Sequence, residues 1–267
     1  MINIIVSGAT GRMGSRIIAL SRESGDITLV GALERTEHVS LGSDIGEVIG
    51  IGAAGVVVSD SAGALRDRGD VLIDFSNPSA TIACLKALSD RPMPVVIGTT
   101  GFSKDEVEYI GLYAQKTPCV FAPNMSVGVN LLLKVLEDIA RVTGNDYDIE
   151  IVEAHHRLKK DAPSGTAMKM AQVLAAALNR NLEETAVYAR RGLIGERTSH
   201  EIGIQTVRAG DIVGEHTVLF GGLGERIEIT HKASSRDTFA RGALKAARWV
   251  YKQTPGLYDM QDVLGLK

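Results

Sequence analysis

The stretch from Glu153 to Ala167 gathers more reactive side chains than any other short segment of this chain. It reads EAHHRLKKDAPSGTA and sets His155 and His156 beside basic residues and a small polar turn. The histidines end an alternation typical of a strand, in which adjacent side chains point to opposite faces. They therefore make a poor chelating pair, and without an HExxH or CxxC motif the sequence predicts no metal site.

An apolar pattern at helical spacing follows over residues 167–179. Pro163 suits an early helical position, and either Asp161 or Ser164 suits the N-cap. The start of such a helix presents unpaired N–H groups and the positive end of the helix dipole, which together bind anions.

Ser164, Gly165 and Thr166 stand at this helix start, and a glycine there lets a ligand approach the backbone. Ser164 or Thr166 could equally act only as a cap. With Lys159 as a nearby cation and an imidazole for proton transfer, the segment suits reduction of a small, anionic, unsaturated substrate. The alternative to a catalytic role is that one histidine is buried in the core and the other lies on the surface.

Gly8, Gly11 and Gly14 form a second motif, directly after the first apolar run and at the start of a helical pattern. Such glycines permit a tight turn, and they let backbone N–H groups approach a pyrophosphate. Glu34 ends the next apolar run about twenty residues later, where a carboxylate binds the adenosine ribose. Arg35 follows it and could pair with the 2′-phosphate of NADP, so the motif predicts NADH or NADPH without choosing between them.

The elements that must carry these motifs alternate in the first half of the chain. Strand and helix patterns follow one another, which predicts a doubly wound parallel sheet of the Rossmann type. The loops that follow the later strands are small and polar, and they are expected to meet at the edge where such folds bind ligands. The strands are expected at 3–8, 27–34, 71–76, 94–100 and 119–124, and the helices at 12–24 and 78–90.

The second half changes character after an apolar helix expected at 130–144. Apolar/polar alternation over four segments (147–156, 200–210, 214–222 and 225–233) predicts half-buried strands, and hence an inserted α+β substrate domain with a mixed or antiparallel sheet. The last helical pattern should cover the first domain's sheet. We expect a dinucleotide-binding domain at 1–126, a substrate and oligomerisation domain at 127–235, and a returning helix at 236–267.

Composition agrees with a globular enzyme. The 267 residues are 45% hydrophobic, with a formal net charge of -3, which disfavours a broad nucleic-acid footprint. Neither a signal peptide nor a long apolar run is recognisable, so we expect a cytoplasmic protein without a membrane partner. Cys84 and Cys119 lie in apolar patterns and read as small core residues.

Several segments together resemble one known family. Residues 150–167 look like the signature of 4-hydroxy-tetrahydrodipicolinate reductases, also called dihydrodipicolinate reductases, and the resemblance extends to residues 7–14, 96–102, 207–218 and 229–240. It therefore spans essentially the whole chain. The histidine-containing signature is highly specific, whereas the glycine motif alone is not.

The resemblance implies a reaction and a set of roles. Hydride passes from NADH or NADPH to dehydrated 4-hydroxy-tetrahydrodipicolinate in the diaminopimelate route to lysine, and a homotetramer forms through the sheets of the substrate domain. His155 matches the family's proton donor or acceptor, and Lys159 matches its catalytic cation and a proton donor. Positions for the substrate carboxylates are His156, Ser164, Gly165 and Thr166. Positions for the cofactor are Gly8, Ala9, Thr10, Gly11, Arg12, Met13, Gly14, Glu34, Arg35, Gly98, Thr99, Thr100, Ala122, Pro123, Asn124 and Met125.

Two positions depart from the family pattern as we know it. Leu158 stands where some members carry a further histidine, and Met125 stands where an aromatic residue can occur. His231 and Arg236 are weaker candidates: His231 alternates within a strand pattern, and Arg236 could either help to close the cofactor cleft or simply begin the last helix. Two other functions remain open: a different NAD(P)-dependent oxidoreductase, and a nucleotide-sensing regulator without catalysis.

Overall fold

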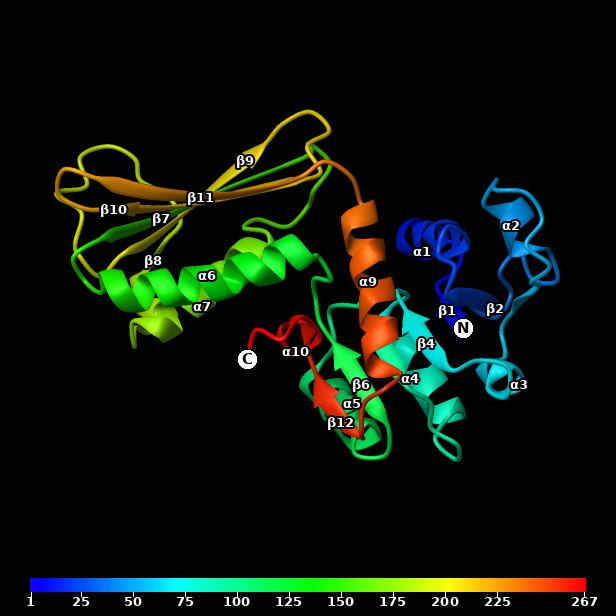
Figure 1. Cartoon of the computed structure of the whole chain (residues 1–267). Helices are drawn as coiled ribbons and strands as arrows, with labels where there is room; N and C mark the ends of the chain where they lie inside the picture. Colours follow the sequence, from blue (N-terminus) through cyan, green and yellow to red (C-terminus); the bar gives the residue numbers. More distant parts are fainter. The chain divides into compact units, whose positions relative to one another are not determined.

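The computed structural model describes residues 1–267 and divides into two compact units (Figure 1). Unit 1 comprises residues 1–127 and 236–267, and unit 2 comprises residues 128–235. Each unit buries its own apolar side chains. The chain therefore leaves unit 1, builds unit 2 as an insertion, and returns to unit 1 with its last helices.

Unit 1 is built on a seven-stranded sheet in which every pairing is parallel. The strand order, β12-β6-β5-β4-β1-β2-β3, reverses direction between β1 and β4. Ligands of doubly wound sheets bind beyond the carboxyl ends of the strands at such a reversal. The strands are β1 (Ile2–Ser7), β2 (Ile27–Leu33), β3 (Val58–Ser59), β4 (Val71–Asp74), β5 (Val95–Ile97), β6 (Pro118–Phe121) and β12 (Gly256–Tyr258).

Helices cover both faces of this sheet. Successive strand residues point to opposite faces, so that Ile4 packs in one apolar cluster and Ile5 in the other. The first cluster includes residues of α1 (Arg12–Arg22), α2 (Ile45–Val48), α9 (Asp237–Val250) and α10 (Met260–Leu264). The second includes residues of α3 (Ala62–Leu65), α4 (Pro78–Ala87) and α5 (Lys104–Ala114).

The carboxyl ends of five strands lie in one row. Ser7 pairs with Leu33 and with Asp74, and the row continues through Ile97 to Phe121. The next residue after each strand end therefore lies at the same edge of the sheet. Those residues are Gly8, Glu34, Phe75, Gly98 and Ala122, and four of them belong to the predicted cofactor set.

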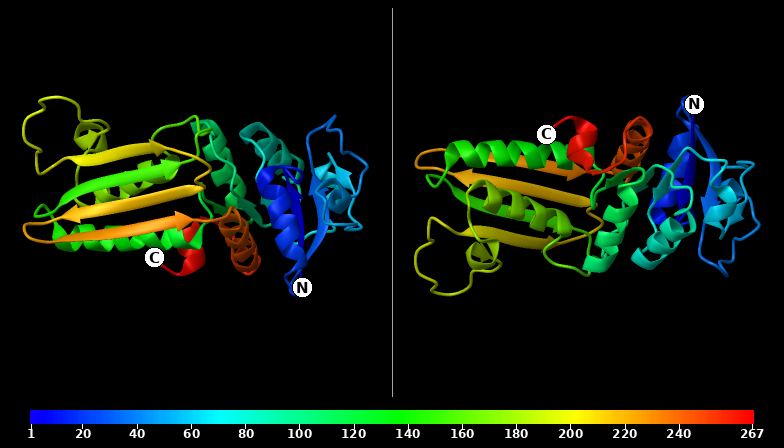
Figure 2. Two further views of the ribbon diagram at one scale, coloured as in Figure 1. Left: turned by 90° about the horizontal axis from the view of Figure 1, so that it is seen from above. Right: turned by 90° about the horizontal axis from the view of Figure 1, so that it is seen from below.

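Unit 2 has a five-stranded mixed sheet, in the order β11-β10-β7-β9-β8. β10 runs antiparallel to β7 and β11, whereas β7, β9 and β8 run parallel. Helices α6 and α7 cover one face, and Figure 2 shows the other face without helices. The elements are α6 (Val127–Thr143), β7 (Asp148–His155), α7 (Gly165–Ala177), α8 (Leu182–Thr185), β8 (Ala186–Val187), β9 (Ile202–Arg208), β10 (Gly214–Gly221) and β11 (Arg226–Ala233).

The predicted fold class is confirmed, with local differences. The short strands β3 and β12 carry no periodic signal and were not predicted. Helix α6 begins at Val127 rather than near residue 130, and Pro163 precedes the N-cap Ser164 instead of lying inside α7. Cys84 and Cys119 are both free and buried. None of the helices combines the length and the apolar character needed to cross a bilayer.

Candidate active site

The first glycine turn is packed too tightly for side chains. Gly8 has a φ of 71°, and a Cβ there would lie 2.6 Å from the Phe75 carbonyl oxygen. A Cβ on Gly14 would lie 2.1 Å from the Gly8 carbonyl oxygen, so helix α1 packs directly on the turn. Gly11 caps α1 without a side-chain hydrogen bond, and no acidic residue occupies the first helical turn. This cradle fits a pyrophosphate.

Glu34 lies beside the same turn. Its Oε1 accepts hydrogen bonds from the Thr10 N–H at 2.9 Å and from the Thr10 hydroxyl at 2.7 Å. The structure thus brings the predicted ribose-binding carboxylate against the glycine turn, 24 residues away in sequence. Arg35 directly follows Glu34, and Arg12 lies at the start of α1. Both side chains are exposed, and neither forms an ion pair with Glu34. The residues present fit an adenine dinucleotide.

Asp74 organises the neighbouring loops, and sequence analysis did not single it out. This side chain is fully buried, and its Oδ1 accepts from the hydroxyls of Ser76 at 2.9 Å, Thr81 at 2.7 Å and Thr99 at 2.6 Å. The Thr99 hydroxyl oxygen in turn accepts from the Ser76 N–H. The loops after β4 and β5, including Gly98, Thr99 and Thr100, are therefore held together at the carboxyl edge.

The loop after β6 holds the rest of the predicted cofactor set, Ala122, Pro123, Asn124 and Met125. Pro123 is exposed and Asn124 is half-buried, and the Asn124 side chain accepts from the Ser126 N–H. Met125 is only 1% exposed and belongs to the apolar core. Its carbonyl lies where a Cβ on Gly242 of α9 would stand. The Met125 side chain is thus a core residue, which the sequence alone did not reveal.

Strand β7 carries the chemistry of unit 2. Its alternation places Ile149, Ile151, Glu153 and His155 on the face that the helices cover, and all four are buried. His156 follows the strand and is half-buried, with its N–H bonded to the Ile212 carbonyl. The prediction that the two histidines face differently agrees with this burial.

Glu153 is the hub of a buried polar cluster. Arg208 of β9 donates to both of its oxygens, at 2.9 Å each. His155 Nδ1 lies 2.6 Å from Oε2, and the Ser164 N–H donates to Oε1 at 3.0 Å. The Thr206 hydroxyl adds a longer bond of 3.3 Å. A buried carboxylate is stable only with such partners.

The three residues at the start of α7 that were predicted to bind the substrate carboxylates differ in burial. Ser164 is buried, accepts from the Ala167 N–H as the N-cap, and makes a 3.0 Å hydrogen bond to His216 Nε2. Its hydroxyl therefore faces inward. Gly165 is exposed, with open space where a Cβ would stand, and Thr166 is half-buried. The backbone of this turn is the part that an anion can reach.

Lys159 lies in the turn between β7 and α7. Its N–H donates to the His156 carbonyl, and its Nζ lies 2.9 Å from Asp161 Oδ1. The Lys159 charge is close enough to lower the pKa of His155. This effect is smaller than that of burial, and it places the predicted cation near the predicted imidazole.

Burial and charge set the protonation of the cluster. Burial would raise the pKa of Glu153, but hydrogen bonds from Arg208, His155 and Ser164 outweigh it and leave this pKa below its usual value. The pKa of His155 is lowered chiefly by burial, although Glu153 opposes the shift. Burial and the neighbouring His155 lower the pKa of His216 to about 4. At neutral pH the cluster pairs a carboxylate with neutral imidazoles.

The remaining candidates have local roles in this structure. His231 pairs with His216 across β10 and β11, and its Nδ1 is buried without a hydrogen-bond partner. Arg236 is exposed and stands at the N-cap of α9, as one of its two predicted interpretations had it. Leu158 is 78% exposed, so it contributes no packing.

Comparison with known families decides the identity. The N-terminal model of dihydrodipicolinate reductase matches residues 2–125, and the C-terminal model matches residues 128–264. The chain belongs to the dihydrodipicolinate reductase family. The 4-hydroxy-tetrahydrodipicolinate reductases of Syntrophus aciditrophicus and Geobacter sulfurreducens are 56% and 54% identical to it over 267 residues, covering all of each chain. The predicted family and enzyme class are confirmed.

Solved structures agree on this family's fold. A dipicolinate-bound dihydrodipicolinate reductase from Paenisporosarcina sp. TG-14 matches with a TM-score of 0.76 and 25% identity, covering 98% of both chains. An amine dehydrogenase from Mycobacterium smegmatis matches with a TM-score of 0.60 at 14% identity, over 96% of this chain and 94% of its own. The second likeness concerns the fold alone. The family match and the curated reductases, rather than the fold, favour an enzyme over the nucleotide-sensing regulator.

Proposed function

We propose that the chain carries out the reaction of its family with His155 as the proton carrier and Lys159 as the cation that holds the substrate. That reaction is the nicotinamide-dependent reduction of 4-hydroxy-tetrahydrodipicolinate to tetrahydrodipicolinate in lysine biosynthesis. The observation that carries these roles is the arrangement of one short segment. It joins a buried imidazole, a turn with Lys159 and an open helix start.

The substrate carboxylates suit the first turn of α7. Gly165 is exposed and leaves the backbone open, and the first helical turn has no acidic side chain that would repel an anion. The helix dipole favours negative charge at this point by roughly 0.3–1 kcal/mol. We assign the carboxylates to Gly165, Thr166 and His156, with Lys159 as their counter-charge. The solved relative that holds dipicolinate, an aromatic dicarboxylate, supports this class of ligand.

Ser164 supports this site from behind. Its hydroxyl is committed to the Ala167 N–H and to His216, and its own N–H is committed to Glu153. We therefore propose that Ser164 fixes the position of the helix start, and that the neighbouring backbone contacts the substrate.

The bound cofactor supplies the hydride. On the protein's side, the turn from Gly8 to Gly14 would hold the pyrophosphate, and Glu34 would bind the ribose hydroxyls of NADH. Arg35 is exposed beside Glu34 and is free to pair with the 2′-phosphate of NADPH. We propose that the chain accepts both cofactors.

His155 would deliver a proton to the reduced, enamine-like ring. Burial keeps its pKa below that of an ordinary histidine, so that at neutral pH it is mostly the neutral imidazole. The ring therefore takes up a proton from the solvent in each cycle before it passes that proton to the substrate. Removal of such a group lowers kcat by about 10²–10⁴-fold.

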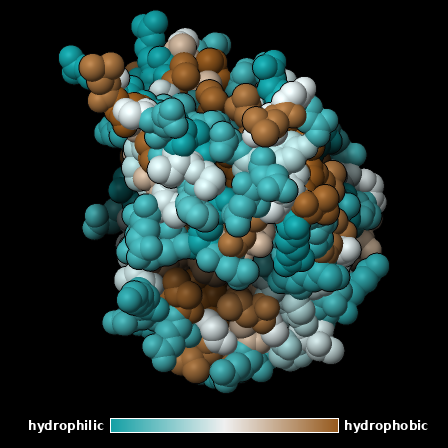
Figure 3. Space-filling view, turned by 90° about the vertical axis from the view of Figure 1, so that its left-hand side faces the viewer, coloured by the Kyte–Doolittle hydropathy of each residue, from teal (hydrophilic) through white to brown (hydrophobic).

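We also propose a homotetramer that forms through the open face of the unit 2 sheet. This face carries half-exposed or exposed apolar residues such as Val152, Val207 and Leu219, which a second copy would cover. Figure 3 shows apolar side chains scattered among polar ones over the end of this unit.

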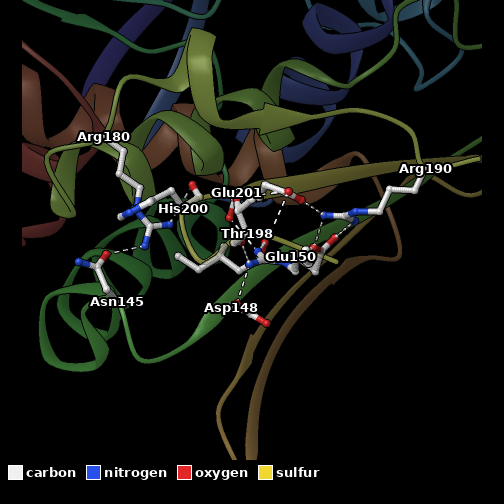
Figure 4. Close-up of polar contacts among 10 residues, drawn as sticks. Asn145, Asp148, Glu150, Arg180, Arg190, Thr198, His200 and Glu201 are labelled. Carbon is white, nitrogen blue, oxygen red and sulfur yellow. Dashed lines mark hydrogen bonds and ion pairs between the residues drawn. The ribbon is translucent and has the colours of Figure 1, made fainter. Parts of the chain in front are cut away.

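The segment between β8 and β9 is bound by ion pairs to β7, on the open face of the same sheet. Arg190 donates to both oxygens of Glu150 and to Glu201 (Figure 4). Arg197 pairs with Glu150 and Asp148. These ion pairs fix the ends of a loop whose tip exposes Leu193 and Ile194.

Light scattering tests the tetramer with two leucine variants. Leu219→Asp, on the open face, should reduce the wild-type mass to that of a smaller assembly. Leu223→Asp, on the exposed β10–β11 hairpin, should leave the mass unchanged. A monomeric wild type would contradict the proposal.

We place this enzyme in the cytoplasm, where the buried thiols Cys84 and Cys119 stay reduced.

The proposed roles are tested by NADH and NADPH oxidation with 4-hydroxy-tetrahydrodipicolinate generated in situ. Lys159→Met keeps the length of the side chain but removes its charge, so the KM for the substrate should rise and kcat should fall. His155→Asn should lower kcat with little change in KM. Lys160→Met, next in sequence and exposed, is the matched control and should behave like the wild type. An unchanged kcat in His155→Asn would refute the assignment of His155.

A further inference from the structure

Glu153 touches each part of the proposed site. Its Oε2 bonds to His155 Nδ1, and its Oε1 accepts from the Ser164 N–H at the start of α7. Arg208, which grips both Glu153 oxygens, also donates to the Asp161 carbonyl at 2.7 Å in the turn between β7 and α7. One fully buried carboxylate therefore connects the proton carrier, the anion-binding turn and the turn that holds the cation.

We propose that Glu153 is a positioning residue that holds His155 as the Nδ1–H tautomer and leaves Nε2 as the atom that receives and delivers the proton. This inference deepens the proposed function, because it rests on His155 as the proton carrier. It assigns Glu153 and Arg208 to the reaction although neither has to touch the substrate.

The tautomer follows from the donors around Glu153. Three groups other than His155 donate four hydrogen bonds to it: Ser164 and Thr206 donate one each, and Arg208 donates two and supplies a fixed positive charge on both oxygens. These hydrogen bonds keep the pKa of Glu153 low despite its burial. An ionised carboxylate only accepts hydrogen bonds, so the facing His155 Nδ1 must carry the hydrogen. The separation of 2.6 Å is typical of a strong, charge-assisted bond.

The opposite ring nitrogen faces a glycine. His155 Nε2 lies beside Gly214, at the start of β10, where a Cβ would stand 3.0 Å from it. A larger residue at this position would press on the ring. The neutral ring can take a solvent proton at Nε2, and the imidazolium is then stabilised by Glu153. Release of that proton to the substrate carbon restores the Nδ1–H tautomer.

Several charged or titratable groups face the His155 ring. Glu153 lies on the same strand, Arg208 on β9 and His216 on β10, where its ring centroid is 5.2 Å away. Lys159 faces it from the turn after β7. Glu153 is the only acidic group among them, so its removal should leave His155 among cations and a neutral imidazole, and the pKa of His155 should fall further.

Nuclear magnetic resonance tests the tautomer directly on the substrate-free protein. The chain has only six histidines, so protein labelled with ¹⁵N in the histidine rings gives a short spectrum, and His155→Asn identifies the His155 signals. In the wild type, Nδ1 of His155 should be protonated and Nε2 not. A wild-type His155 in the Nε2–H form would overturn the proposal without any variant being needed.

Glu153→Gln tests the consequence for catalysis. Its amide can donate to Nδ1 as well as accept from it, so the tautomer should become mixed or reversed. We expect kcat to fall between roughly 10- and 100-fold, with the KM for the substrate changing less than twofold. The pKa seen in the pH profile of kcat should move to lower pH. Unchanged tautomer and unchanged kcat in this variant would contradict the inference.

Two further variants separate positioning from a loss of structure. Glu153→Asp keeps the negative charge and should recover part of the kcat that Glu153→Gln loses, whereas a purely volumetric role would predict the reverse. Thr206→Val removes only the longest hydrogen bond to Glu153 and should keep the wild-type tautomer and kcat. If neither cofactor is oxidised by the wild type, the proposed function fails, while the wild-type spectrum still decides whether Glu153 sets the His155 tautomer.

Discussion

Gly14→Ala offers a sharp test of the nucleotide turn, because the structure gives the size of the clash. The new Cβ would lie 2.1 Å from the Gly8 carbonyl oxygen and 2.8 Å from its carbon, and both atoms are backbone. Ordinary contact begins at 3.4 Å, so helix and turn must separate by about 1.3 Å. Overpacking of this kind costs roughly 1–3 kcal/mol, although alanine regains about 0.5–1 kcal/mol of helix propensity.

Gly111→Ala is the matched control in the same unit. Gly111 lies inside helix α5, and nothing lies within 4 Å of the position of its Cβ. The same substitution should therefore stabilise unit 1 here by about 0.5–1 kcal/mol and leave cofactor binding intact. The packing therefore predicts changes in the free energy of unfolding of opposite sign for the same substitution at these two helical glycines.

The measurement uses the only tryptophan, Trp249 in α9 of unit 1, as a probe of urea unfolding. Calorimetric titration with NADPH gives the affinity in parallel. Gly14→Ala should lower the unfolding free energy by about 1 kcal/mol, near the middle of the balance of the two terms above, and weaken NADPH binding at least roughly tenfold. If Gly14→Ala binds NADPH normally and is stabilised like Gly111→Ala, the proposed cradle is wrong.

Three further outcomes are expected. Arg35→Ala should raise the Kd for NADPH several-fold more than the Kd for NADH, as measured by calorimetry at fixed salt, and equal losses would contradict the 2′-phosphate contact. Burial lowers the pKa of His216 to about 4 in the folded protein, against 6.5 in the unfolded chain. The unfolded chain therefore binds more protons between these values, and about 3 kcal/mol of stability is lost as the pH falls from 6.5 to 4. In urea unfolding, His216→Asn should lose less stability in acid than the wild type does. Asp74→Asn should destabilise unit 1 by about 1–3 kcal/mol and weaken binding of both cofactors, whereas an unperturbed Kd would show that the Asp74 cluster does not support the cofactor loops.

The fold was accessible from the sequence where periodicity was strong. The alternation over residues 147–156 predicted the strand β7 and opposite faces for His155 and His156, and the glycine turn after the first apolar run predicted the start of helix α1. β3 and β12 have two and three residues, too few for a period to register. They add to a sheet that longer strands already define, so their pairing depends on tertiary context.

The site was only partly accessible, because its polar partners come from distant strands. Glu153 stood in the quoted signature, yet its role depends on Arg208, 55 residues further along the chain, and on Ser164. His216 is linked to Ser164 across 52 residues. An acidic residue at a buried position of a strand was the available signal, since such a residue requires partners.

Two side chains show that a local pattern indicates where a residue lies but not which way its side chain points. Ser164 is a helix cap whose hydroxyl faces His216, and Met125 is a core residue against α9. Both lie inside segments that the sequence predicted to form the ligand-binding surfaces. Which way each side chain turns depends on neighbours that a local pattern does not contain.

The central claim is a hydride transfer onto the ring of the substrate, and isotope transfer tests it most directly. The protein would be incubated with NADPH that carries deuterium at the transferred position and with 4-hydroxy-tetrahydrodipicolinate generated in situ. The mass of the product would then be measured by mass spectrometry. We predict tetrahydrodipicolinate that carries one deuterium, formed in step with NADPH oxidation. Cofactor that stays reduced, or product that stays unlabelled, would contradict the account.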